Sequence, residues 1–247
     1  MSVVAVTGAT AGIGLGIARE FARAGHQVLA AGRSAERGRA VEAELRDAGL
    51  DVTFVAADVA TVAGSRHVVE TALSRHGALD VLVNNAGTVG PAPLVTFAGT
   101  DEATFDLLLA TNLRSVFFTT QAAAPVMRPG GVIFNIGSIA GETVGRGMVA
   151  YRTTKAAAMF LSDCLAEVLR PDGITVHTIV VHRVRSEGGD RTLAARIAQD
   201  ELDPEAADRL RDDYLASAVE PDELGRRLAE MLDHPGISIG PGFTVRR

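Results

Sequence analysis

The chain has 247 residues, of which 47% are hydrophobic and only 4% aromatic, so we expect a core of small aliphatic side chains, as in helix-covered parallel sheets. A formal net charge of -6, with no basic run, argues against nucleic acid or an anionic membrane as a partner. The single cysteine, Cys164, excludes an internal disulfide, and no apolar run reaches the roughly 20 residues of a spanning helix. The first strand-like run begins almost at Met1 and leaves no room for a signal peptide, so the expected location is cytoplasmic.

The first half of the chain alternates short apolar runs with amphipathic stretches. The helix-like stretches close at Gly25, Gly49 and Gly77, where glycine most easily adopts the left-handed conformation that ends a helix. This rhythm predicts consecutive parallel strands joined by right-handed helical crossovers. The predicted strands are residues 3–6, 27–31, 52–56 and 79–84.

The second half continues the alternation of helices and strands, which a polar segment at residues 186–218 then interrupts. We expect helices over residues 105–127 and 151–169, strands at 132–136 and 175–180, a helix at 222–232 and a short strand at 237–245. Residues 186–218 are polar and helical in composition, and this segment is either a substrate cover or an ordinary surface insertion. The sequence therefore predicts one domain over residues 1–247, an α/β Rossmann-type doubly wound parallel sheet of about seven strands with helices on both faces.

A glycine-rich turn follows the first predicted strand. Gly8, Gly12 and Gly14 allow a tight turn and close backbone approach, and the following helix offers free N–H groups to a pyrophosphate. The spacing differs from the common G-x-G-x-x-G, and by itself such a turn has a purely structural alternative.

The end of the second strand indicates which dinucleotide is bound. An acidic residue there contacts a free ribose 2′-OH, whereas arginine accommodates a 2′-phosphate. This strand is followed by Arg33 and Ser34, with Arg37 nearby and no carboxylate. NADP(H) is therefore the expected cofactor and NAD(H) the less favoured one, although arginine is abundant throughout the chain and the glycine turn itself contains no basic residue.

Tyr151 and Lys155 are four residues apart in a helical pattern and so share one helix face. An ammonium about 4 Å from a phenol, at an effective dielectric of about 20, supplies roughly 4 kcal/mol. That is about enough to bring a tyrosine pKa from about 10 to near 7. An isolated Y-x-x-x-K is more often a surface pair, but Ser138 ends a predicted strand at the sheet edge where α/β proteins bind ligands.

Lys155 is the single lysine among 24 basic residues, which leaves 23 arginines. Codon bias explains the arginines, and it makes the exception informative. Arginine cannot readily lose a proton and is broader than an ammonium, so position 155 has a specific need for lysine.

At this point the sequence resembles the short-chain dehydrogenase/reductase family, in its shorter single-domain branch, over essentially the whole chain. The serine and tyrosine of the resemblance are separated by the expected 13 positions, from 138 to 151. The matching motifs, in order, are the glycine turn at residues 7–14, Asp58-Val59, Asn84 to Gly87, Asn112, Ser138, and Tyr151 to Lys155.

The resemblance implies catalytic roles. Tyr151 donates a proton to a carbonyl oxygen that Ser138 orients. Lys155 lowers the tyrosine pKa and binds the nicotinamide ribose, and Asn112 holds a water of a proton relay. The cofactor contacts that we expect are Gly8, Thr10, Gly12, Ile13, Gly14, Arg33, Ser34, Asp58, Val59, Asn85, Ala86, Gly87, Tyr151, Lys155, Val184 and Ser186. No metal is expected.

The segment after the sixth strand departs from the family. Relatives usually have Pro-Gly-x-x-x-Thr there, whereas this chain has Val181-His182 at the first two positions and Ser186 at the last. The change removes a rigid turn and adds bulk beside the nicotinamide. The side chains of His182, Arg183 and Arg185 are either a positive rim for an anionic substrate or solvated surface charge.

The predicted function is NADP(H)-dependent interconversion of a ketone or aldehyde and an alcohol. The alternative is a catalytically weak NADP(H)-binding protein with a regulatory role. The resemblance further implies a homotetramer or homodimer packed through the helices that carry Asn112 and Tyr151, with a small carbonyl compound or alcohol as substrate.

Overall fold

The computed structural model describes residues 1–91, 96–199, 203–234 and 242–246, and these residues form a single domain around one sheet. The sheet has seven strands in the order β3-β2-β1-β4-β5-β6-β7, which confirms the predicted doubly wound Rossmann-type architecture. The strands are β1 Val3–Thr7, β2 Gln27–Gly32, β3 Val52–Ala56, β4 Val81–Asn84, β5 Val132–Ser138, β6 Thr175–Val181 and β7 Phe243–Arg246.

The first six strands pair in parallel, as expected, but β7 pairs antiparallel with β6. Phe243 lies opposite Val181, and the N–H of His182 donates to Gly242 O at 3.1 Å. The last strand therefore starts where β6 ends and runs back along it, so β7 is the one antiparallel strand of the described, mostly parallel sheet. Of the predicted strand 237–245, residues 237–241 lie outside the described residues.

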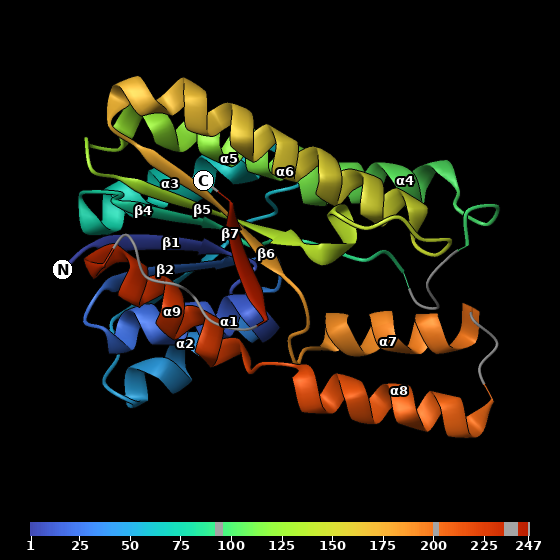
Figure 1. Ribbon diagram of the computed structural model, residues 1–247. Helices are drawn as coiled ribbons and strands as arrows, with labels where there is room; N and C mark the ends of the chain where they lie inside the picture. The colour runs from blue at the N-terminus through green and yellow to red at the C-terminus, as the bar shows by residue number, and fades with distance from the viewer. Residues whose placement is uncertain (92–95, 200–202, 235–241, 247) are drawn as a thin grey trace.

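Helices cover both faces of the sheet (Figure 1). Helices α1, α2 and α9 pack on one face, whereas α3, α5 and α6 pack on the other. Because each strand faces helices on both sides, the central strands are buried along nearly their whole length. The helices are α1 Gly12–Arg23, α2 Ala35–Asp47, α3 Val62–His76, α4 Glu102–Leu109, α5 Ser115–Ala123, α6 Val149–Leu169, α7 Glu187–Gln199, α8 Pro204–Ser217 and α9 Pro221–Asp233.

Local chemistry explains where the helices end. Gly25, Gly49 and Gly77 have positive φ values of 86°, 78° and 75°, which confirms their predicted place just after a helix. The predicted helix 105–127 is interrupted: a π-helical segment, Ala110–Arg114, separates α4 from α5, and a short 3₁₀ turn follows at Ala124–Val126. Such π segments often occur at functional sites.

The polar segment after β6 forms α7 and α8, which project beyond the carboxyl ends of the strands (Figure 1). Its predicted helical character is confirmed. Within the described ranges, no helix is long and apolar enough to cross a membrane.

Candidate active site

The glycine turn between β1 and α1 is built from residues that tolerate no side chain. Gly8 and Gly12 have φ values of 66° and 53°, a region that favours glycine. A Cβ on Gly14 would lie 2.2 Å from Gly8 O, so α1 can approach the turn this closely only with glycine there. The helix begins after Ala11 without a side-chain cap and without an acidic residue in its first turn. Its first N–H groups are thus left for an anion.

The end of β4 fixes this turn in place. The Asn85 side chain donates to Thr7 O at 2.9 Å and to Gly8 O at 3.2 Å. The Thr7 hydroxyl in turn accepts from the N–H of Asn85 and from that of Ala86, each at 3.0 Å. The predicted N-N-A-G motif therefore positions the glycine turn through side-chain and backbone hydrogen bonds.

The residues after β2, where a phosphate site is expected, differ in whether they face the cavity. Arg33 and Arg37 are exposed and line the cavity beside the glycine turn. The Ser34 hydroxyl accepts from Arg37 N at 3.2 Å and so caps α2, outside the cavity lining. Arginine is therefore the side chain that faces the cavity here.

Asp58 and Val59, at the end of β3, also lie outside the cavity lining of the described residues. The Asp58 carboxylate accepts from Ala60 N at 3.1 Å and stays exposed, while Val59 is buried in the core. The structure therefore gives this pair a role in shaping the turn that starts α3.

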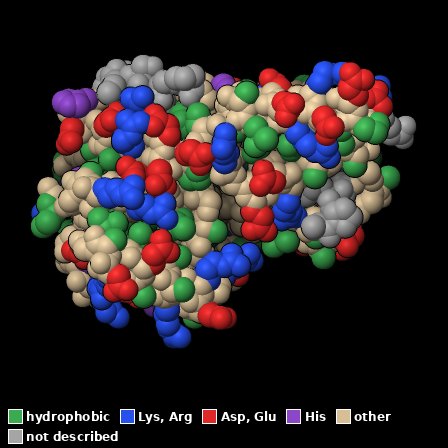
Figure 2. Space-filling view, turned by 90° about the horizontal axis from the view of Figure 1, so that it is seen from below, with side chains coloured by type: hydrophobic (Ala, Val, Ile, Leu, Met, Phe, Trp, Pro, Cys, Tyr) green, Lys and Arg blue, Asp and Glu red, His purple; other side chains and the backbone are tan. Residues whose placement is uncertain are grey.

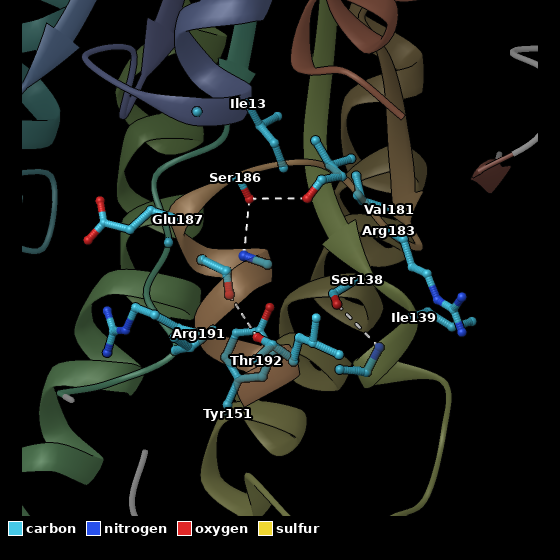
Figure 3. Close-up of a pocket in the computed structure, with 18 of the residues that line it drawn as sticks. Ile13, Ser138, Ile139, Tyr151, Val181, Arg183, Ser186, Glu187, Arg191 and Thr192 are labelled. Carbon is cyan, nitrogen blue, oxygen red and sulfur yellow. Dashed lines mark hydrogen bonds between the residues drawn. The ribbon is translucent and has the colours of Figure 1, made fainter. Parts of the chain in front are cut away.

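Ser138, Tyr151 and Lys155 meet at the carboxyl end of β5. Ser138 is the last residue of β5, and Tyr151 lies in the first turn of α6 with Lys155 one turn further on. Lys155 is only 7% exposed, and its Nζ donates to Ile136 O at 3.0 Å. The Ser138 hydroxyl accepts from Ala140 N at 3.2 Å. All three predicted side chains line one cavity, in which Figure 3 shows Ser138 and Tyr151 below the glycine-turn residue Ile13.

The environment shifts both titratable groups. Burial raises the pKa of Tyr151, while its hydrogen bond with Ser138 and the nearby charge of Arg152 act in the opposite direction. Burial lowers the pKa of Lys155 to about 8. The expected lowering of the tyrosine pKa by Lys155 stays a prediction, because the influences on Tyr151 in this structure come from elsewhere.

Asn112 lies in the π-helical segment and is almost fully buried. Its Oδ1 accepts from Thr88 N at 2.7 Å, and its Nδ2 donates to Thr88 O at 2.9 Å and to Thr154 Oγ1 at 3.0 Å. Thr154 Oγ1 donates to Tyr151 O at 2.9 Å, which joins this loop to the catalytic helix. The side chain is therefore fully engaged in positioning, and its water-holding role stays a prediction.

Sequence reasoning missed both threonines. Thr88 directly follows Gly87, and Thr154 directly precedes Lys155, so their places beside motif residues were the available signal.

The loop after β6 is held by helix α8 in place of a proline-glycine turn. The buried Tyr214 donates its hydroxyl proton to Val184 O at 2.7 Å. Arg183 pairs with Asp213 at 2.7 Å, and Arg185 donates to Leu215 O at 2.9 Å. These contacts draw the loop against the C-terminal half of α8.

The same contacts bear on whether Arg183 and Arg185 form a positive rim for an anionic substrate. Arg183 is paired with Asp213, and Arg185 lies 3.3 Å from Glu220. Their charges are balanced by these acidic neighbours, so the interpretation of this pair as a rim for an anionic substrate is not supported. Tyr214 was missed because position 214 lies 30 residues from the carbonyl that it holds.

Most of the predicted site residues line one cavity of about 2070 Å³. It lies at the carboxyl edge of the sheet, and the hollow between the two lobes in Figure 2 opens in this region. Asn112, Ser34, Asp58 and Val59 are the predicted site residues outside its described lining. The predicted residues that line it are Gly8, Thr10, Gly12, Ile13, Gly14, Arg33, Asn85, Ala86, Gly87, Ser138, Tyr151, Lys155, Val184 and Ser186.

The residues present fit a dinucleotide. A Cβ on Gly87 would lie 3.4 Å from Lys155 Nζ and 3.3 Å from Asn112 Oδ1, so the missing side chain leaves open space beside the ammonium. The uncapped start of α1 and exposed Arg33 line the same cavity, where N–H groups and a guanidinium suit phosphate.

Comparison with known proteins agrees with this geometry. The family model described as short chain dehydrogenase matches residues 2–195. The chain is 34% identical over 209 residues to a 3beta-hydroxysteroid dehydrogenase of Mediterraneibacter gnavus, covering 82% of this chain and 75% of that protein.

Two solved structures are similar over nearly the whole chain. A dehydrogenase/reductase from Sinorhizobium meliloti has a TM-score of 0.80 at 29% identity and covers 94% of this chain and 87% of its own. A short chain dehydrogenase from Burkholderia cenocepacia, in complex with NADP, has a TM-score of 0.76 at 28% identity, with 93% and 89% covered. The chain therefore belongs to the short-chain dehydrogenase/reductase family and is an oxidoreductase of the kind that uses a nicotinamide cofactor.

Proposed function

We propose that the protein is an NADP(H)-dependent oxidoreductase that interconverts a ketone or aldehyde with an alcohol. The observation that carries this proposal is that Ser138, Tyr151 and Lys155 share one cavity with the glycine turn and with Arg33. The cavity thus offers a proton donor and a carbonyl-orienting hydroxyl beside a dinucleotide cradle.

The preference for the 2′-phosphorylated cofactor rests on the end of β2. Arg33 and Arg37 are exposed into the cavity, and β2 is followed by no carboxylate that would repel a phosphate. The Burkholderia cenocepacia relative, which was solved with NADP, supports the same choice. A cellular pool of reduced cofactor favours the direction of carbonyl reduction.

Each residue of the site has a physical task in this reaction. A nicotinamide cofactor, when bound, would supply or accept the hydride. Tyr151 gives its hydroxyl proton to the carbonyl oxygen, which the Ser138 hydroxyl holds by a hydrogen bond. The buried Lys155 ammonium offers donors to the cofactor ribose and favours the phenolate that is left behind. Asn112, through Thr88 and Thr154, keeps the loop after β4 aligned with α6.

Helices α7 and α8 are proposed to cover the substrate. Gly188, Thr192 and Tyr214 line the cavity from this side. Closure by such a segment would exclude water from the reacting carbonyl.

We further propose a homodimer or homotetramer packed through the α4–α5 and α6 helices, in the cytoplasm. Phe160 is 70% exposed and Val168 66% exposed on α6, and Phe117 on α5 is 42% exposed. Apolar groups of this size on neighbouring helices indicate a protein interface. The free, exposed Cys164 suits a reducing compartment.

Binding of NADPH and of NADH to the purified protein, followed by fluorescence titration, tests the proposal. We expect NADPH to bind tightly and Arg33→Ala to weaken it about 10- to 100-fold, because charge-assisted hydrogen bonds contribute about 1.5–3 kcal/mol each. Affinity for NADH should change little. Arg39→Ala, an exposed arginine of α2 outside the cavity lining, is the matched control.

Absence of binding by either cofactor would contradict the proposal. Tight NADPH binding without turnover of any ketone would instead indicate a cofactor-binding protein without reductase activity.

A further inference from the structure

The lining of the active-site cavity is strongly positive although the chain as a whole is negative. Its described residues include seven arginines and Lys155, whereas Glu187 is the single acidic residue among them. The whole chain carries a formal net charge of -6. Positive charge is therefore concentrated where cofactor and substrate bind, which raises the local concentration of anions.

The cofactor accounts for part of this charge. Arg33 and Arg37 lie beside the glycine turn, where a dinucleotide places its phosphates. Arg183 is compensated by Asp213. Arg146, Arg152 and Arg191 line the same cavity from the loop before α6, from α6 and from α7, and the structure shows no ion pair between any of these three and a described acidic residue.

This lack of pairing contrasts with the rest of the molecule. Arginines outside the cavity commonly have acidic partners, as Arg19 has Asp222 at 2.8 Å and Arg246 has Asp163 at 2.8 Å. The chain thus has carboxylates to place beside arginines, and the described residues place none beside Arg146, Arg152 or Arg191.

Of the three, Arg191 is the one with a buried side-chain nitrogen that lacks a partner among the described residues. It lies on α7 and is partly buried, and one of its terminal nitrogens donates to Gly90 O at 2.5 Å. Its Nε is buried and has no hydrogen-bond partner among the described residues. Glu187, one helical turn earlier, extends to the same side of α7 in Figure 3 but is exposed and forms no ion pair with Arg191 in the described structure. A buried donor without a partner, such as this Nε, is costly unless a ligand satisfies it.

Arg146 and Arg152 add positive charge to the cavity from the loop before α6 and from the first turn of α6. Arg146 is exposed in the loop before α6, and no acidic partner for it occurs among the described residues. Arg152 donates to Gly147 O at 2.9 Å and to Thr143 O at 2.9 Å, contacts that hold the loop but leave its charge uncompensated. The charge of Arg152 reaches Tyr151, since it acts on the pKa of that phenol.

We propose that the substrate is a carbonyl compound that carries an anionic group, a carboxylate or a phosphate ester, which Arg191 binds and Arg146 attracts. This inference rests on the proposed function. It assigns the charge that binds the substrate to α7 and to the loop before α6, and not to Arg183 and Arg185, which lie between β6 and α7.

Matched pairs of ketones test the proposal. Acetoacetate and its neutral ethyl ester differ by a carboxylate, whereas acetoacetyl-4′-phosphopantetheine and the neutral acetoacetyl-pantetheine differ only by a phosphate. In each pair the ratio of kcat/KM for the anionic member to that for the neutral member is measured with NADPH. The ratio is expected to exceed one in at least one pair, and that pair identifies carboxylate or phosphate as the group recognised.

Arg191→Gln is expected to lower that ratio by about 10-fold or more, mainly through KM, because a charged hydrogen bond is removed while an amide donor remains for Gly90 O. Arg191→Lys should restore much of the ratio. Arg66→Gln, an exposed arginine of α3 outside the cavity lining, is the matched control and should leave the ratio unchanged. A purely structural role for Arg191 would reduce both members of a pair equally, and this result would overturn the proposal.

Failure of the proposed function gives a different result, in which the wild type reduces none of the four ketones. In that case isothermal titration calorimetry of acetoacetate and of coenzyme A into the NADP-saturated protein tests whether the anion site exists. Binding of either anion that is weakened in Arg191→Gln supports the anion site, whereas equal binding by both proteins, or no binding, overturns it.

Discussion

The two walls of the active-site cavity are built in different ways. On the wall formed by β1, α1 and β4, main-chain groups and glycines make the surface, and Asn85 and Thr7 hold it rigid. On the wall formed by the loop after β6 with α7 and α8, long side chains such as Arg183 and Tyr214 make the contacts. A backbone surface accepts few substitutions, whereas a side-chain surface can be rebuilt one residue at a time.

The largest effect is expected on the backbone wall. In Gly14→Ala the new Cβ would lie 2.2 Å from Gly8 O, a main-chain atom that cannot move without opening the turn. We expect NADPH affinity, measured by fluorescence titration, to fall more than about 100-fold, and the free energy of unfolding to fall by about 2 kcal/mol or more.

The contrasting substitution on the side-chain wall is Gly188→Ala, where an added Cβ meets no atom within 4 Å. Because Gly188 lies in α7, alanine should stabilise the protein by about 0.5–1 kcal/mol in denaturant unfolding. Equal losses of stability in the two variants would remove the distinction between the walls.

A second prediction concerns Lys155, which lies between the walls. Its folded pKa of about 8 is below the ordinary lysine value, so the charged form destabilises the fold by about 3 kcal/mol. This cost is fully present below pH 8 and is relieved as the pH rises towards the unfolded value of about 10.4. Lys155→Met should therefore raise the free energy of unfolding at pH 7 by about 1–3 kcal/mol, after loss of the hydrogen bond to Ile136 O, and should abolish turnover.

The stability difference between Lys155→Met and the wild type, measured by urea unfolding, should shrink between pH 8 and pH 10. If this difference were constant over the pH range, or if the variant were less stable than the wild type at pH 7, the buried charge of Lys155 would not destabilise the folded state.

A smaller effect is expected at Tyr214. Tyr214→Phe removes a buried hydrogen bond to Val184 O and should lower the free energy of unfolding by about 1 kcal/mol. NADPH affinity should fall about 3- to 10-fold, because the loop that carries Val184 and Ser186 along the cavity loses its attachment to α8.

The smallest effect is expected from the control Asp213→Asn. It breaks the exposed pair with Arg183 and should change the free energy of unfolding by less than about 0.5 kcal/mol. If Asp213→Asn weakened NADPH binding more than Tyr214→Phe, the exposed ion pair would be the main attachment, and the ranking of these contacts would be reversed.

The division between the walls also marks what could be predicted from the sequence. The glycine turn, the N-N-A-G segment and the Ser138, Tyr151 and Lys155 set are short local patterns, and the structure brings their side chains to one cavity. The ends of the first three helices could be predicted from glycines, because the left-handed backbone conformation at a helix end is also a local property.

Long-range contacts could not be predicted in this way. The bond from Tyr214 to Val184 joins residues 30 positions apart with no motif at either end, and the Asn112–Thr154 contact spans 42 positions. The antiparallel direction of β7 depends on where the chain returns to β6, which its short apolar pattern does not encode.

The bridge between Val184 and Val219 has an evolutionary consequence. It joins the segment that leads into α7 to the segment that follows α8, at the base of the α7–α8 hairpin. Both residues lie outside the strands of the sheet. Because the hairpin is closed at its base, its length and sequence can change at little entropic cost to the sheet. We therefore expect that most of residues 187–217 can be exchanged as a unit to change substrate preference, provided that Tyr214, which holds the loop beside the cofactor half, is kept.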